Sequence, residues 1–236
     1  MIATIINAVL VLLGSAIGLL FRKYISDRFS KVVTQALALC VASIGISMAI
    51  KTADTLCVII CMVLGVLIGE LLKIEDRLDG AGEFLRRKLI RDGDNNRFTE
   101  GFVTATLLYC VGAMAITGSI EAGLNHNYGI IVSKGVIDGV TSITFAATMG
   151  VGVAFSVIPI LVYQGAITLL ASVVGPYLPA TVITEMSAVG GIAIMGLAIN
   201  VLNIPNLRIK VGNMLPAIFL PIAYIPLAEW IGSLIG

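Results

Sequence analysis

The sequence predicts an all-α, polytopic membrane protein. Its 236 residues are 58% hydrophobic and only 12% charged, whereas soluble domains carry about 25% charged residues. Uncharged stretches recur from end to end, and each is long enough to cross a hydrocarbon layer of about 30 Å. The charges are concentrated, since 14 of the 29 lie within residues 73–100. A soluble fold is therefore excluded, and that segment is expected in water or at the membrane surface.

Apolar runs bounded by charges or turn residues predict eight spans. The spans are expected at residues 2–21, 32–50, 55–72, 99–118, 130–148, 151–174, 182–202 and 211–235. These runs lack the period-2 alternation of barrel strands, and backbone groups must be paired in lipid, so each is expected to be a helix. The first run has no basic n-region or cleavage site, so it is expected to be retained rather than removed as a signal peptide.

Basic residues predict the orientation through the positive-inside rule. With both termini outside, 13 of the 15 Lys and Arg residues lie in the cytoplasm, Lys51 lies outside and Lys134 lies in a span. Residues 139–184 contain no charged residue, so no charge indicates whether the turn near Gly150 lies in water. If residues 129–148 formed a re-entrant hairpin, only seven segments would cross and 11 basic residues would be inside. Eight spans are therefore preferred.

Residues 74–89 predict an amphipathic helix between the third and fourth spans. Its apolar residues recur at spacings of three and four, with charged residues on the other face; they are Ile74, Leu78, Ala81, Leu85 and Leu89. Such a helix is expected to lie on the lipid headgroups and connect two spans, with a membrane-surface sensor or gate as the alternative. A polar loop is expected at 91–97.

Two parts of the chain match weakly at an offset of 150 or 151 residues, which predicts an internal repeat. The segment VVTQ at 32–35 aligns with VITE at 182–185, and Gly14, Ala42 and Gly45 meet Gly165, Ala193 and Gly196. The second unit begins an odd number of crossings later, so the repeats would be inverted, as in transporters with sites at the repeat interface. We expect one membrane domain made of repeats at 1–72 and 149–236, a surface segment at 73–98 and two central spans at 99–148.

Small residues, prolines and cysteines predict local packing. GxxxG spacings at 14–18 and 65–69 indicate close helix packing within the fold, with a seam between two copies, and hence a homo-oligomer, as the alternative. Pro216, Pro221 and Pro226 predict a kinked or interrupted last span. The four cysteines lie in apolar runs, where we expect neither a disulfide nor a metal site.

Asp138 is the first candidate for ion binding, because a charged group in a span costs about 2.5 to 3.5 kcal/mol on insertion scales and marks a functional site by default. It lies near the middle of span five. The neighbouring hydroxyls of Thr141, Ser142 and Thr144 could complete an oxygen shell for a hard cation. The structural alternative is an ion pair with Lys134, four residues earlier on the same helical face. The sequence leaves both interpretations open.

Glu185 is the second candidate, although it lies near the start of span seven, where a solvated interfacial carboxylate is the alternative. Gly190 and Gly191 follow it and would let the helix unwind and expose carbonyls to an ion. Thr184 and Ser187 would add neutral oxygens.

Amides in or at the ends of spans are further candidate ligands, with cross-helix hydrogen bonding as their commoner role. They are Asn7, Gln164, Asn200 and Asn213. We expect Asp138 and Glu185 to share one site between the repeats and to alternate between binding sodium and a proton. Glu185 is the better candidate for coupling, because its repeat counterpart is the neutral Gln35.

Six motifs along the chain together carry a family resemblance. They are FTEGF at 98–102, YCVGAMAI at 109–116, KGVIDGVTS at 134–142, YQG at 163–165, TEMSAVGG at 184–191 and GNMLPA at 212–217. With these motifs the chain resembles the YqgA/YdfK-like family of uncharacterised prokaryotic integral membrane proteins. The resemblance implies a bacterial cytoplasmic membrane location. The family has been described as a possible sodium channel or pump and has been linked to biofilm formation, and the resemblance implies these roles for the chain. The family has no established substrate.

Other function classes are disfavoured by what the sequence lacks. The balanced net charge of +1 gives no basic surface for nucleic acid. The single histidine, His126, is in a loop, and no HExxH, GxSxG or Walker A motif is present, so a zinc protease, a serine hydrolase and ATP-driven pumping are not expected. A channel or secondary transporter for a small ion remains, needing no cofactor and partnered by lipid. A non-transporting scaffold or signalling component is the alternative.

Overall fold

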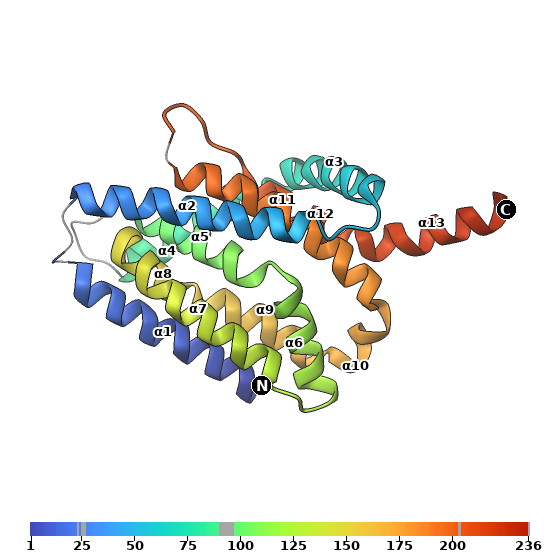
Figure 1. Cartoon of the computed structure of the whole chain (residues 1–236), viewed down its shortest axis with the longest axis horizontal. Coiled ribbons are helices and arrows are strands. Elements are labelled where there is room, and N and C mark those ends of the chain that lie inside the picture. Colours follow the sequence, from blue (N-terminus) through green and yellow to red (C-terminus); the bar gives the residue numbers. More distant parts are fainter. Residues whose placement is uncertain (23, 25–26, 90–96, 203, 236) are drawn as a thin grey trace.

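Every element of the described chain is helical, as the sequence predicts. The structure is a computed structural model that describes residues 1–22, 24, 27–89, 97–202 and 204–235 (Figure 1). The α-helices are α1 (Ile2–Arg22), α2 (Asp27–Ala49), α3 (Thr55–Leu72), α4 (Ile74–Leu89), α5 (Arg97–Cys110), α6 (Ala113–Leu124), α7 (Gly129–Met149), α8 (Gly152–Phe155), α9 (Val157–Leu169), α10 (Ala171–Val174), α11 (Ala180–Val201), α12 (Leu215–Phe219) and α13 (Pro221–Ile235). The 3-10 helices are η1 (Gly175–Tyr177) and η2 (Val211–Met214). Lys23, residues 91–96 of the expected loop and the side chain of Leu89 lie outside the described residues.

The helices are long and apolar enough for the predicted multi-pass class. Within the described chain, six segments could each cross a membrane, namely α1, α2, α3, α7, α8 with α9, and α11. Two bent pairs pass the same test together: α5 with α6 at 59°, and η2–α12 with α13 at 44°. Counting each bent pair as one span gives eight, at the positions predicted. The bend before Pro221 confirms the interruption that the prolines predict.

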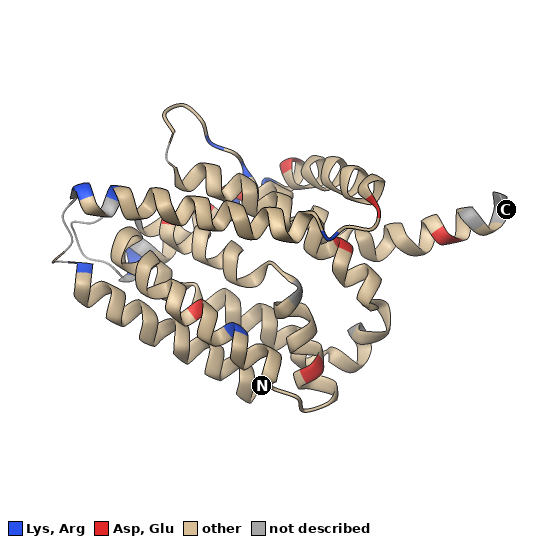
Figure 2. Cartoon of the chain, viewed as in Figure 1, with Lys and Arg blue, Asp and Glu red and all other residues tan. Residues whose placement is uncertain are grey.

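Most of the described Lys and Arg residues gather at one end of the bundle, which we call the basic end (Figure 2), whereas Lys51 lies in the α2–α3 loop and Lys134 within α7. Arg208, in the loop after α11, pairs with Asp79 of α4 at 2.5 Å, and Lys210 pairs with Glu70 of α3 at 2.8 Å. The hydrogen bond to Glu70 raises the pKa of the exposed Lys210 above its ordinary value. Both chain termini lie away from this end (Figure 1).

Helix α7 is one continuous helix of 21 residues rather than a hairpin. It lies along α1, and the turn that follows it meets the basic end, because a Cβ added at Gly150 would lie 2.9 Å from the Arg22 guanidinium. The re-entrant alternative with seven crossings is therefore not supported.

Small residues bring pairs of helices into direct backbone contact. A Cβ added at Gly14 would lie 2.0 Å from the Gly139 carbonyl oxygen, so α1 and α7 meet where neither has a side chain. The same relation holds at 2.6 Å between Gly45 of α2 and the Gly191 carbonyl of α11. Gly65 packs as closely on Ala217. The GxxxG glycines therefore serve packing within the fold, as small residues commonly do between membrane helices.

The helix break lies in the α5–α6 pair and not in α11, which corrects the expected unwinding. Gly190 and Gly191 sit inside the continuous helix α11, where they allow α2 and Val111 to approach. The chain instead breaks between Cys110 and Ala113. Gly112 there has φ of +130°, a backbone conformation that favours glycine.

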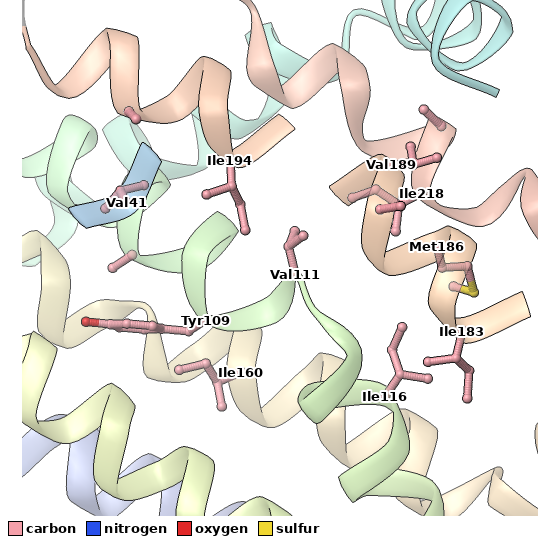
Figure 3. Packing of buried hydrophobic residues seen from close by; sticks show 14 of the residues in the cluster. Val41, Tyr109, Val111, Ile116, Ile160, Ile183, Met186, Val189, Ile194 and Ile218 are labelled. Carbon is pink, nitrogen blue, oxygen red and sulfur yellow. The ribbon is translucent and has the colours of Figure 1, made fainter. Parts of the chain in front are cut away.

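The largest apolar cluster fills the space between α11 and the α5–α6 pair (Figure 3). Val111 lies in the break and Ile116 follows it on α6, both opposite Met186 and Val189 of α11. Because α5 and α6 contact both α7 and α11, they separate these two helices. This separation determines which polar residues can meet.

Helix α4 forms as predicted. Of its expected apolar residues, Ile74, Leu78 and Leu85 are half-buried and Ala81 is exposed. An acidic row also turns inward: Glu75 is only 6% exposed, and Asp79 meets Arg208. The side chains of one helical face recur every three or four residues, so Glu75, Asp79 and Glu83 share that face. The inverted repeat, with the domain limits built on it, stays a prediction.

Candidate functional site

A buried ion pair occupies the interior of the α1–α7–α9 part of the bundle. Lys134 and Asp138 stand one turn apart on α7 and form a hydrogen-bonded salt bridge. Each residue is only 6% exposed. Removing two charges from water costs several kcal/mol per ion unless they are paired and hydrogen-bonded. The structure therefore contains the pair that the sequence offered as the structural alternative for Asp138.

A pair of amides lies beside these charges. Asn7 of α1 donates a hydrogen bond of 3.0 Å from its Nδ2 to Oε1 of Gln164 on α9. Asn7 also lies at the level of the ion pair, since a Cβ added at Gly135 would be 3.0 Å from its Cα. The other amide atoms, Asn7 Oδ1 and Gln164 Nε2, are buried with no hydrogen-bond partner within the described chain. Buried polar atoms are normally hydrogen-bonded, so these two atoms are available to a water, an ion or a polar ligand group.

Two threonines extend this unpaired polar surface. The hydroxyls of Thr4 on α1 and Thr168 on α9 are likewise buried and without a partner in the part of the chain that the structure describes. Thr4 lies one turn before Asn7 on α1, and Thr168 lies one turn after Gln164 on α9. Since α1 and α9 carry these groups at matching spacing, four polar side chains line their contact.

Tyr109, near the end of α5, completes the cluster from the other side. It is 1% exposed, and its hydroxyl lies 2.9 Å from Ser142 Oγ and 3.5 Å from Thr141 Oγ1. The Lys134 ammonium lies 5.9 Å from the centre of its ring, within the range of a cation–π interaction. Figure 3 shows the Tyr109 ring in the core beside Ile160. Tyr109 thus connects the ion pair to the break that follows Cys110.

We call these residues the polar row. Its members are Thr4, Asn7, Tyr109, Lys134, Asp138, Thr141, Ser142, Gln164 and Thr168. Thr141 and Ser142 both donate to the backbone carbonyl of Asp138, and the oxygen shell around the Asp138 carboxylate stays a prediction. Among the described residues, no group of three or more His, Cys, Asp or Glu side chains could hold a metal ion.

Glu185 lies elsewhere, at the start of α11. Its carboxylate accepts hydrogen bonds from Thr52 Oγ1 at 2.5 Å and from the Ala53 amide at 2.7 Å. It therefore holds the loop between α2 and α3, and its 3% exposure is not that of the solvated carboxylate that the sequence left as the alternative. The structure does not bring Glu185 together with Asp138, because α5 and α6 lie between their helices.

The other predicted ligands lie outside the polar row. Asn200 exchanges two hydrogen bonds with the backbone of Ile209, and Asn213 bonds the Glu75 amide and the Glu70 carboxylate. Both amides fix turns near the basic end. Thr184 donates to the Ala180 carbonyl one turn earlier in α11, and Ser187 is buried in α11.

Sequence reasoning missed three members of the row, namely Tyr109, Thr4 and Thr168. Tyr109 stands in the YCVGAMAI motif next to the break, which was a usable signal. Thr4 and Thr168 gave a weaker signal, a polar residue three or four positions from an amide on the same helix.

The fold and the polar row define a multi-pass helical membrane protein with a charged pair buried between its helices. The chain belongs to the family described as "Protein of unknown function (DUF554)", whose model matches residues 2–225. It is similar to the "Uncharacterized membrane protein YdfK" of Bacillus subtilis (strain 168), with 31% identity over 225 residues and 94% of each chain covered. It is also similar to the "Uncharacterized protein YqgA" of Escherichia coli (strain K12), with 28% identity over 222 residues, 93% of this chain and 94% of that one. No solved structure matches the chain. The family indicated by the six motifs is confirmed.

Proposed function

We propose that this protein transports a small cation, sodium or a proton, across the bacterial cytoplasmic membrane, as a secondary transporter or channel without catalytic activity. The observation that carries the proposal is the buried Lys134–Asp138 pair beside Asn7, which is hydrogen-bonded to Gln164 and whose own carbonyl oxygen has no partner in the described chain. Ionisable groups inside a membrane bundle are expensive and mark ion pathways by default. A scaffold would be as stable, or more so, with apolar residues at these positions.

Lys134 is the internal competitor of the transported cation in this proposal. In the empty state its ammonium occupies Asp138. An arriving sodium ion or proton neutralises the carboxylate, and the ammonium is then released toward Tyr109 and the end of α5. A helix carboxyl terminus carries partial negative charge and stabilises a cation near it.

The unpaired atoms of Asn7, Gln164, Thr4 and Thr168 supply the route to Asp138. They form a row of buried polar groups from the amino-terminal end of α1 to the ion pair. Groups of this kind hold water or a partly dehydrated ion through hydrogen bonds. We assign the binding step to Asp138 rather than Glu185, since the Glu185 carboxylate already accepts two hydrogen bonds from the α2–α3 loop.

The proposed orientation places the basic end in the cytoplasm and both termini outside. Its support is that Arg22, Arg208 and Lys210 meet the same end of the bundle as α4, which is what the positive-inside rule requires of cytoplasmic loops.

Flux measurements on the purified protein in proteoliposomes test this function. Sodium- and pH-sensitive dyes inside the vesicles should report gradient-driven entry. Asp138→Asn should reduce it at least tenfold, and Asn7→Ala should reduce it less. Glu121→Gln is the matched control, because Glu121 lies on α6 outside the polar row and its exposed carboxylate accepts a hydrogen bond from Asn125. Wild-type flux in Asp138→Asn would reject transport through this pair and favour the scaffold alternative.

A further inference from the structure

Two buried hydroxyls outside the polar row also lack hydrogen-bond partners. Ser15 of α1 is 0% exposed and Thr106 of α5 is 8% exposed. Neither hydroxyl has a partner within the part of the chain that the structure describes. Buried polar atoms are normally hydrogen-bonded, so these two groups are available to water or to another polar group.

Ser15 lies on the side of the ion pair that faces the basic end. It follows Gly14, whose added Cβ would lie 2.0 Å from the carbonyl oxygen of Gly139. Gly139 is the residue after Asp138 on α7, so Ser15 stands just beyond the level of the Asp138 carboxylate. From Ser15, α1 continues to Arg22 at the basic end (Figure 1).

Thr106 lies on the same side, along α5. Helix α5 starts near the basic end, where a Cβ added at Gly152 would lie 2.0 Å from the Phe98 carbonyl oxygen. Thr106 is one turn before Tyr109, whose hydroxyl shares a hydrogen bond of 2.9 Å with Ser142 in which either group can donate. Unpaired polar groups therefore lie on both sides of the ion pair, between it and each end of the bundle.

The unpaired amide atoms beside the ion pair favour water over a metal ion. Asn7 donates to Gln164, which leaves one amide oxygen and one amide nitrogen without partners in the described chain. Any bonded pair of amides leaves one donor and one acceptor, whichever amide donates. Hard cations take oxygen ligands, whereas water both donates and accepts, so water satisfies both atoms. The Lys134 ammonium is a further nitrogen donor at the Asp138 carboxylate.

We propose that the ion moved by this protein is a proton, and that it travels on hydrogen-bonded water from the outer part of the polar row to Asp138, and then past Ser15 and Thr106 to the basic end. This inference rests on the transport function proposed above, and it assigns the ion and the inner half of the route. Buried water with two to four polar partners is a normal part of protein structure.

The proton step is balanced without any other reactant. A proton arriving on water adds to the Asp138 carboxylate, and the salt bridge to Lys134 breaks. The Lys134 ammonium keeps its own protons and stays near the ring of Tyr109. Asp138 then gives the proton to water on the inner side, and the salt bridge forms again.

The groups around Asp138 leave its carboxylate as the acceptor. Its titratable neighbours are the Lys134 ammonium of its own helix and, from α5, the phenol of Tyr109 and the thiol of Cys110. From α1 it meets the neutral amide of Asn7. Among these groups the carboxylate is the anion, so the arriving proton binds there.

Proton entry into proteoliposomes that contain the purified full-length protein, in choline buffers free of sodium, tests the proposal. Valinomycin and a potassium gradient set an inside-negative potential, and an internal pH-sensitive dye reports entry. We expect the wild type to acidify the vesicles without sodium, and to take up radioactive sodium no faster than empty vesicles. Ser15→Ala combined with Thr106→Val removes both hydroxyls with little change in volume and should lower proton entry at least tenfold. Ser119→Ala is the matched control and should keep the wild-type rate, because the buried Ser119 hydroxyl already donates to the Ala115 carbonyl at 2.6 Å.

The outcomes separate this inference from the transport function. Sodium uptake above that of empty vesicles, or proton entry that requires sodium, would overturn the proposal and leave transport standing. Proton entry at the wild-type rate in the Ser15 and Thr106 double variant would overturn the inner route. Entry of neither ion through the wild type would reject transport itself. Elution of the double variant at the wild-type volume in size-exclusion chromatography shows that a lost flux does not come from misfolding.

Discussion

Replacing Asp138 with Asn should destabilise the protein by about 3 to 5 kcal/mol, because the Lys134 ammonium would stay buried without its carboxylate. Both residues are 6% exposed. The Lys134 ammonium is paired with the Asp138 carboxylate and also lies over the ring of Tyr109. A loss of this size amounts to roughly a thousandfold change in the folding equilibrium, since each 1.4 kcal/mol is a factor of ten.

The double variant with Lys134→Met and Asp138→Leu separates stability from function. Apolar side chains of similar volume remove both desolvation costs, so the double variant should be within about 1 kcal/mol of the wild type or more stable. Its cation flux should nevertheless be lost. Unfolding by denaturant in bicelles, followed by far-UV circular dichroism, measures the stability, and proteoliposomes measure the flux.

Two results would refute this reasoning. A loss below about 1 kcal/mol in Asp138→Asn would show that the charges are not desolvated as their burial indicates. Full flux in the apolar double variant would show that the pair serves only packing.

Three further predictions concern topology, the α2–α3 loop and the α1–α7 contact. In a background without the native cysteines, Ser233→Cys should react with an impermeant reagent in intact cells and Asp76→Cys only after lysis; the opposite pattern would invert the proposed orientation. Glu185→Gln should speed amide exchange in residues 50–54 about tenfold, because two charge-assisted hydrogen bonds lose about 1.4 kcal/mol, and unchanged exchange measured by mass spectrometry would contradict this. Gly14→Leu should lower the free energy of unfolding by about 1 to 3 kcal/mol, since its Cβ would lie 2.0 Å from a carbonyl oxygen of α7; Gly80→Ala, with nothing within 4 Å, is the control.

Composition and local spacing determined the fold class and the limits of the spans. Uncharged runs of about 20 residues must become helices in lipid, whatever surrounds them, because their backbone groups find partners within the segment. Once that segment is a helix, the Lys134–Asp138 pair also follows from the sequence, because side chains four residues apart on a helix are neighbours. The clustered prolines likewise located the bend in the last span.

The side-by-side arrangement of the helices was decided only by tertiary structure. Sequence reasoning placed Asp138 and Glu185 in one site, but α5 and α6 lie between their helices, and each carboxylate has its own partners. It also read Gly190 and Gly191 as a helix break, whereas they let α2 and Val111 pack against α11. Hydropathy and period describe one helix at a time, and every span is apolar. Which faces meet depends on side-chain volumes and backbone approach between segments far apart in the chain, and these act only once the helices pack together.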